Sequence, residues 1–346
     1  WLSIPVGRHI QVIMDDVEYT WLLTLSACPT PAEQARWRPH GPYTTEETFR
    51  IIQRQAEHRR YRGALRTHRQ EKMLSRYAAR RRKGDTISAI ARSVDFSPCM
   101  LARVLLENVY GWPKPNISSL FKELVQNDPT QSATAQRAIQ SAKDNADDVC
   151  RLMVEVKECI ETDAACSPLA DRVRHNMGVE YEYVLLEKLR NRGLVFESED
   201  VLREKGLAKT PDVRLLLPIG VYDQDGTMHV VHWIDSKAMF GDRHVHDTEN
   251  AGQLQGYVNR FGPGMVIYWF GHVANLSSDS DVFITHEFPE RIAFPGGCDP
   301  LETASNSPAQ LRVGAPLQLR PVSQASTTFD DTGRPTTRCR VLAAIQ

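Results

Sequence analysis

The spacing of hydrophobic residues is helical in the first half of the chain. Between about residues 45 and 165, apolar side chains recur three and four positions apart, as at Phe49, Ile52 and Ala56. This period places the apolar residues on one face of an α-helix. Residues 86–109 show the same period on both sides of a tight turn, which predicts two short consecutive helices. The segment is therefore predicted to be a helical region.

The pattern changes after residue 170. Residues 171–192 keep the helical period and end at Gly193, a residue suited to the left-handed conformation that follows many helices. Short β-prone runs with one helix among them occupy the following segment. In order they are strands at 194–197, 213–221 and 228–234, a helix at 249–261, and strands at 265–271 and 282–284. The core order predicted for residues 171–290 is α-β-β-β-α-β.

The two ends of the chain lack this periodicity. Residues 1–44 contain several Pro and Gly residues and are left unassigned, with poor order expected. Residues 297–346 are rich in Ser, Thr, Pro, Ala and Gln and are predicted to be disordered. The apolar run at 21–25 is too short for a signal sequence or a membrane span, so no membrane association is expected.

Composition agrees with two folded regions in an ordinary globular protein. The chain has 346 residues and is 41% hydrophobic and 25% charged. This length exceeds the roughly 100–200 residues of a single domain. The seven cysteines are scattered without a C-x-x-C pair, which argues against a zinc or redox motif and favours a reducing intracellular compartment.

A net charge of −1 conceals one strongly basic segment. Residues 50–83 contain thirteen lysines and arginines against two acids, a local charge of +11. Such a segment can attract a polyanion, because each neutralised phosphate releases condensed counterions. The alternative is a solvated helix face. The candidate phosphate-binding residues are Arg59, Arg60, Arg62, Arg80, Arg81, Arg82 and Lys83.

The helix pair near 86–109 has the layout of a helix-turn-helix. In that motif the second helix enters the major groove of DNA. Helix pairs with a Ser-Pro turn also occur in helical domains that bind nothing, so simple packing remains the alternative. The adjacent basic segment favours nucleic acid.

Three polar residues are expected to converge at one end of the predicted hairpin. Pro211-Asp212 opens the second strand, and Asp235-Ser236-Lys237 closes the third. Because side chains alternate along a strand, Asp235 and Lys237 emerge on one face, where Asp212 of the partner strand can meet them. Two converging carboxylates favour a cation, and Mg²⁺ (or Mn²⁺) takes such oxygen ligands while keeping waters. Lys237 beside that ion can orient or deprotonate a water, or stabilise charge on a scissile phosphate.

The flanking helices offer further polar groups. Glu180 and Glu182 precede the hairpin, and either can add a third carboxylate. Gln253 and Tyr257 follow it and lie one helical turn apart, so they share a face and can hold the ion, the water or the phosphate backbone. In the alternative interpretation, the two aspartates are turn residues and the lysine is a solvated strand end.

Several segments resemble the codanin-interacting nucleases. They are KTPD, HWIDSKAMFGD and NRFGPGMVIYWFG, and ARSVDFSPCMLARVLLE extends the resemblance back to about residue 45. That family belongs to the PD-(D/E)xK superfamily and is similar to archaeal Holliday junction resolvases. The resemblance identifies the chain as a member from a distant animal. It implies an α/β restriction-endonuclease-like nuclease domain over 171–290, preceded by an α-helical, helix-turn-helix-like region over 45–165.

The resemblance also assigns roles to individual residues. The family's paired acids fall on Glu180 and Glu182, and the spacing to the helix-ending glycine favours Glu182 as the metal ligand. The positions that match the family's remaining site residues are Asp212, Asp235, Lys237, Gln253 and Tyr257. Asp235 stands where the family can have Glu, which shortens the ligand by one methylene. Residues 1–44 do not resemble the family.

These observations predict a metal-dependent nuclease that hydrolyses phosphodiester bonds in DNA or structured nucleic acid. The resemblance adds a codanin-like partner, a location in nucleus and cytoplasm, and a homodimer as one arrangement, because resolvases cut two strands symmetrically. The first alternative is a weakly active or inactive nuclease fold that serves as a codanin-binding module. The second is a DNA-binding protein that uses only its helix-turn-helix.

Overall fold

The computed structural model describes residues 13–26, 46–142, 145–276 and 279–297. All of them lie in the first of two compact units into which the chain divides, residues 1–303. The predicted disordered tail at 297–346 lies almost wholly outside the described residues. Within the described part, no helix is long and apolar enough to cross a membrane.

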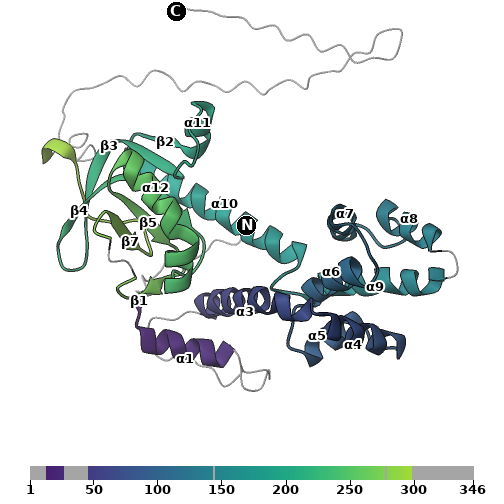
Figure 1. The fold of residues 1–346 in the computed structure, drawn as a ribbon. Helices are drawn as coiled ribbons and strands as arrows, with labels where there is room; N and C mark the ends of the chain where they lie inside the picture. The colour runs from purple at the N-terminus through teal and green to yellow at the C-terminus, as the bar shows by residue number, and fades with distance from the viewer. Residues whose placement is uncertain (1–12, 27–45, 143–144, 277–278, 298–346) are drawn as a thin grey trace, which may run out of the picture. The chain divides into compact units, whose positions relative to one another are not determined.

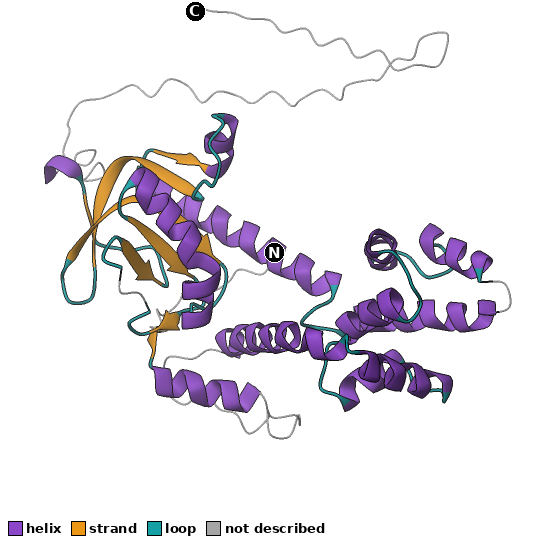
Figure 2. Cartoon of the chain, viewed as in Figure 1, coloured by secondary structure: helices purple, strands orange, loops and turns teal. Residues whose placement is uncertain are grey.

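Helices alone form the described residues between 46 and 162 (Figures 1 and 2). In order they are α3 (Glu46–His68), α4 (Glu71–Arg82), α5 (Ile87–Ser93), α6 (Pro98–Asn108), α7 (Lys114–Leu124), α8 (Ala133–Ser141) and α9 (Ala146–Thr162). Hydroxyl caps begin several of them, since Thr86 and Ser97 each accept a hydrogen bond from the backbone N–H three residues on. The helical prediction for this region is confirmed.

The second helix of the expected helix-turn-helix is buried in the helical bundle. Most of α6 faces the apolar core through Cys99, Leu101, Ala102, Val104, Leu105 and Leu106. Its one basic residue, Arg103, places its guanidinium carbon 3.9 Å from the ring centroid of Phe121. A recognition helix needs an exposed polar face to enter a groove. The expectation that this helix reads DNA is therefore wrong for the structure as described, and packing explains the pattern.

An α/β region follows the bundle. Its elements are α10 (Pro168–Asn191), β2 (Phe196–Ser198), α11 (Glu199–Glu204), β3 (Val213–Tyr222), β4 (Met228–Lys237), a π-helix (Val245–Asn250), α12 (Ala251–Phe261), β5 (Gly264–Tyr268), β6 (His272–Val273), β7 (Val282–Thr285) and β8 (Ile292–Ala293). The main sheet has the order β2-β3-β4-β5-β7, and β8 pairs with β3. The pairs β2–β3 and β3–β4 are antiparallel, whereas the pairs β4–β5 and β5–β7 are parallel. The predicted order of elements is confirmed, and α11 and the short strands add to it.

Helices cover both faces of this sheet, because side chains on β4 and β5 alternate between two apolar clusters. On one face, Leu254 and Tyr257 of α12 cluster with Trp233 of β4. On the other, Leu185 and Leu189 of α10 cluster with the strand residues that point the opposite way. Figure 1 shows α10 and α12 beside the strands they cover. Trp233 marks the face from which Asp235 and Lys237 also project, since alternate residues share a face.

Two segments outside the predicted nuclease region join its core. Phe49 and Ile52 of α3 belong to the same apolar cluster as Trp233. The sequence left residues 1–44 unassigned, but β1 (Ile13–Met14) pairs in parallel with β6, and α1 (Asp16–Ser26) contacts α3. The α/β core is thus completed by the N-terminal part of the chain.

Candidate active site

The hairpin of β3 and β4 brings the motif acids together. Val213 pairs with Ile234 in the antiparallel register, so the preceding Asp212 comes opposite Asp235. Lys237 follows two residues later on the same face of β4. The pairing of neighbouring strands therefore gathers the three residues that the sequence predicted would meet.

Asp235 is buried and incompletely partnered. Its side chain is 1% exposed, and its Oδ2 lies 2.6 Å from the Nζ of Lys237. This contact is an ion pair without hydrogen-bond geometry, and neither carboxylate oxygen accepts a hydrogen bond within the described part of the chain. Burial alone would lower the pKa of Lys237, but the charges of Asp235 and Asp212 outweigh it and raise that pKa. The lysine is thus held as a cation.

Asp212 is the second carboxylate of the site. Its Oδ2 accepts a hydrogen bond of 2.6 Å from the backbone N–H of Ser236. Burial and then the charge of Asp235 raise the pKa of Asp212 well above its ordinary value, and Lys237 and the Ser236 hydrogen bond offset this only in part. Two like charges in a partly buried place favour a further cation when both are ionised.

Of the two glutamates on α10, Glu182 belongs to this site. Burial, then the charges of Glu199 and Asp235, raise the pKa of Glu182. The charge of Glu180 acts instead on the hydroxyl of Tyr181. Residues two apart point about 200° apart around a helix, so only one of the pair can face the hairpin.

Gln253 and Tyr257 support the site from α12. Tyr257 is fully buried, and its hydroxyl donates a 2.8 Å hydrogen bond to the carbonyl of Thr210, two residues before Asp212. The same hydroxyl accepts a hydrogen bond from Gln253 Nε2. Burial, then the charge of Asp235, raises the pKa of Tyr257, so it stays a neutral donor. The structure makes Tyr257 a positioning residue for the loop that carries Asp212.

The sequence missed Glu199, the first residue of α11. Its backbone N–H donates to the carbonyl of Asp212 at 2.9 Å, and its Oε1 accepts from the hydroxyl of Thr210 at 3.2 Å. It also raises the pKa of Glu182. The one local signal for it was an acid in the first turn of a short helix, which is common at any helix start.

The donor chemistry of the site fits a hard divalent cation. Carboxylate oxygens are the ligands that Mg²⁺ prefers, and Asp235 Oδ1 is a buried acceptor with no hydrogen-bond donor among the described residues. In the present side-chain placement, no three His, Cys, Asp or Glu residues of the described chain stand close enough together to hold a metal ion. Asp212 and Asp235 are thus the residues suited to hold it, with Glu182 beside them.

Part of the basic segment forms ion pairs within the protein. Arg59 pairs with Asp242 at 2.5 Å, and ion pairs also hold Arg60 to Asp95 and Arg80 to Asp85. Of the predicted phosphate-binding residues, Arg62, Arg82 and Lys83 are exposed, and no ion pair engages them within the described part.

Arg81 is a buried structural residue. Its guanidinium donates to both carboxylate oxygens of Glu155, at 3.2 and 3.3 Å, and to the hydroxyl of Tyr110. The prediction that it binds phosphate is wrong, because the side chain is only 4% exposed. The helical period of α4 places the side chain of Arg81 on the face that packs against the helical bundle.

Comparison with known proteins places the chain in a family. Residues 148–288 match the family model described as a protein of unknown function with the TPD sequence motif, and Thr210-Pro211-Asp212 is that tripeptide. No solved structure matches. Three similar proteins, from *Xenopus tropicalis*, *Danio rerio* and *Homo sapiens*, are each named CDAN1-interacting nuclease 1.

The similarity extends over much of each chain. Identity to the *Xenopus tropicalis* protein is 39% over 60% of this chain and 63% of the relative. For the *Danio rerio* protein it is 34% over 73% of this chain and 80% of the relative, and for the human protein 34% over 59% and 66%. The match thus spans somewhat less than two thirds of the *Xenopus tropicalis* relative and four fifths of the *Danio rerio* one. The chain belongs to the CDAN1-interacting nuclease 1 family.

Proposed function

We propose that the chain is a metal-dependent nuclease that hydrolyses phosphodiester bonds in DNA or structured nucleic acid. The observation that carries this proposal is the pair of carboxylates, Asp212 and Asp235, that the hairpin brings together beside the ammonium of Lys237. The word nuclease in the relatives' names supports it. The α-β-β-β-α-β order and the D-x-K motif support a restriction-endonuclease-like fold of the PD-(D/E)xK class.

The residues of the site would have different roles in the reaction. Asp212 and Asp235 would hold Mg²⁺ or Mn²⁺, with Glu182 adding charge. When bound, such an ion polarises a phosphate and lowers the pKa of water. Lys237 directs its ammonium toward the same point and can stabilise the charge that develops on phosphate oxygens or orient the attacking water.

The neighbouring backbone keeps the carboxylates in place. The N–H of Ser236 holds the Asp212 carboxylate, and the hydroxyl of Tyr257 holds the loop before it. A ligand fixed in this way loses little entropy on binding, which is the role of groups around a metal centre.

A cleavage assay on linear and branched substrates with Mg²⁺ or Mn²⁺ tests the proposal. Asp212→Ala and Asp235→Ala should abolish cleavage, because each removes a ligand. Lys237→Ala should remove cleavage while leaving metal binding by calorimetry largely intact. Asp200→Ala is the matched control, because Asp200 is exposed on α11 and forms no ion pair within the described residues.

We also propose that the chain binds a codanin-like protein, as the relatives' names say of them. The alternative function is then an adaptor without catalysis. One observation favours it, namely that Lys237 already neutralises Asp235 at 2.6 Å. The adaptor hypothesis predicts no calorimetric binding of Mg²⁺ or Mn²⁺, no cleavage by the unaltered protein, and partner binding indifferent to all three substitutions.

A further inference from the structure

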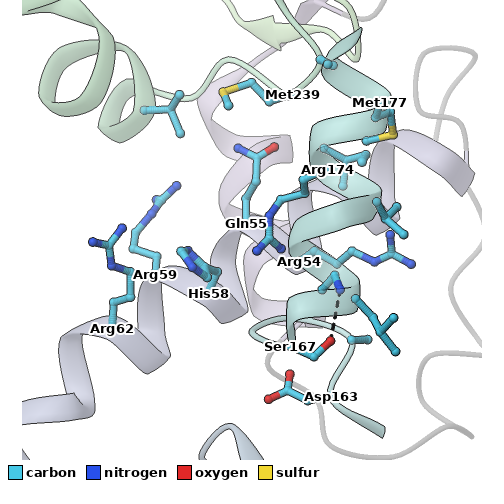
Figure 3. Close-up of a pocket in the computed structure, with 18 of the residues that line it drawn as sticks. Arg54, Gln55, His58, Arg59, Arg62, Asp163, Ser167, Arg174, Met177 and Met239 are labelled. Carbon is cyan, nitrogen blue, oxygen red and sulfur yellow. Dashed lines mark hydrogen bonds between the residues drawn. The ribbon is translucent and has the colours of Figure 1, made fainter. Parts of the chain in front are cut away.

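A cavity of about 870 Å³ lies directly beside the candidate active site. Its walls come from α3, from α10 and from the residues that follow β4, and Ser236 and Lys237 form part of its lining. Figure 3 shows side chains of α3 and α10 extending toward the same space. The cavity therefore offers a route to the reacting groups.

Two contacts fix α3 as a wall of this cavity. The side-chain amide of Gln55 accepts from the N–H of Phe240 at 2.9 Å and donates to its carbonyl at 3.1 Å. Arg59, one turn later, pairs with Asp242, which is 2% exposed. Asp242 also accepts a hydrogen bond from the hydroxyl of Tyr19, so the same carboxylate contacts both α3 and α1.

Cations gather on this wall. Arg54, His58 and Arg62 are spaced four residues apart, so they form one stripe along α3, and Arg174 of α10 also lines the cavity. Burial, then the charges of Arg174 and Arg62, lower the pKa of His58 and favour its neutral form, so the charge of this stripe is that of Arg54 and Arg62. Arg54 and Arg62 are exposed and have no ion pair with any described residue.

The acids of the cavity neutralise this charge only in part. The carboxylate of Asp163 accepts hydrogen bonds from the hydroxyl of Ser97 and from the N–H of Cys99. Glu161 forms an ion pair with Lys157. Glu249 remains exposed. Arg174 pairs with Asp171 and Arg59 with Asp242, so Arg54 and Arg62 are the lining arginines without an ion pair among the described residues. Their guanidinium groups suit an anion.

Part of the cavity lining is apolar. Ile51, Leu169, Val173, Met177 and Met239 contribute to it. Apolar surface beside guanidinium groups suits a nucleobase next to its phosphate, because bases pack on apolar groups and on arginine planes. A cavity of this size, within the range of about 300–1,000 Å³ for small-ligand pockets, holds a short unpaired segment and excludes a base-paired helix.

We propose that this cavity binds an unpaired nucleic-acid strand, with Arg54 and Arg62 contacting its phosphates, and leads the strand to Lys237. The substrate class is then nucleic acid with a single-stranded portion, such as a flap or an overhang. This inference rests on the proposed function for the cut itself, but strand binding can be measured apart from cleavage.

The test uses the full chain in a chelator, so that no cleavage occurs. Fluorescence anisotropy would give the Kd for a labelled twelve-residue oligothymidylate, for an oligouridylate of the same length, and for a blunt duplex. In Arg54→Ala/Arg62→Ala, the Kd for the unpaired strands should rise about 10-fold, and the log–log salt slope should fall by about 1.4, because each lost phosphate contact on a single strand contributes about 0.7.

The matched control is Arg82→Ala/Lys83→Ala, which removes two exposed cations of the same basic segment outside the cavity. It should leave the Kd for the unpaired strands unchanged. Circular dichroism melts of both double variants check that the fold is intact.

Each other outcome has a distinct meaning. Unchanged strand binding in Arg54→Ala/Arg62→Ala, or equal weakening for strand and duplex, overturns the inference. Intact strand binding with lost binding of a codanin-like protein also overturns it and assigns the cavity to a peptide. Strand binding that depends on Arg54 and Arg62 in a protein that cuts nothing with Mg²⁺ supports the inference and removes only the proposed function.

Discussion

Two clusters of buried charge differ in how completely their atoms are partnered. In the helical bundle, Arg81 and Glu155 form a closed network, because Glu155 also accepts from the N–H of Ile87 at 3.0 Å. In the α/β region, the oxygens of Asp235 accept no hydrogen bond among the described residues, and Asp212 adds a second carboxylate. A buried network whose polar atoms are all partnered contributes to the fold. A buried cluster whose carboxylates lack partners can instead bind a cationic ligand.

The largest effect on stability is expected from removing Arg81 from its network with Glu155. Arg81→Ala removes the guanidinium that contacts both oxygens of the buried Glu155 carboxylate and leaves Arg151 as its remaining ion-pair partner, which should lower the free energy of unfolding by about 3 kcal/mol. Urea denaturation measures this. The control Arg82→Ala, one residue on and exposed, should stay within about 0.5 kcal/mol. A loss below 1 kcal/mol in Arg81→Ala would show that the two clusters do not differ in this way.

The next effect concerns the glutamates of α10. Glu182→Ala should weaken Mn²⁺ binding by about 10- to 100-fold, the range seen when groups around a metal site are removed. Glu180→Ala is its matched control on the same helix and should bind Mn²⁺ as the unaltered protein does. Isothermal titration calorimetry compares them, and equal losses would mean that the helix presents both acids to the site.

A smaller effect is expected from the like charges of the open cluster. Because the pKa of Asp212 is raised in the folded chain, the stability that its protonated form contributes is complete below its ordinary pKa and is lost as the pH rises through the raised value. In a chelator, Asp212→Asn should therefore melt a few degrees above the unaltered protein at neutral pH, and the difference should vanish toward pH 4. Added Mg²⁺ should raise the melting temperature of the unaltered protein alone. If the difference in melting temperature between Asp212→Asn and the unaltered protein stays constant with pH, repulsion between the carboxylates does not explain it.

The smallest effect is expected at the exposed end of the basic segment. Removing Arg82 and Lys83 together should lower the salt slope for duplex binding by at most about 1.8, the contribution of two phosphate contacts at about 0.9 each. A fall of the full 1.8 or so, measured by anisotropy, would mean that both residues contact phosphate and would weaken the case for the cavity.

The sequence anticipated the hairpin because its information is local. The turn between β3 and β4 and the alternation of side chains bring Asp212, Asp235 and Lys237 to one place without help from distant residues. The residues alone left Glu180 and Glu182 open, and only the family resemblance favoured Glu182, on whose pKa the charge of Asp235 acts. The helix-turn-helix interpretation failed because a helix buried on most sides and a helix with an exposed face share the same apolar period.

By itself, the sequence determined most helices between residues 45 and 261, the order of the longer strands and the pair of carboxylates at the end of the hairpin. Tertiary structure alone decided that Arg81 is buried, that Glu199 and Tyr257 hold the loop before Asp212, and that α3 docks through Gln55 and Arg59 to form a cavity wall. The physical reason is range. Period and turn chemistry act between near neighbours, whereas the partner of a buried charge or the wall of a cavity comes from residues far away in the chain, whose approach no local pattern records.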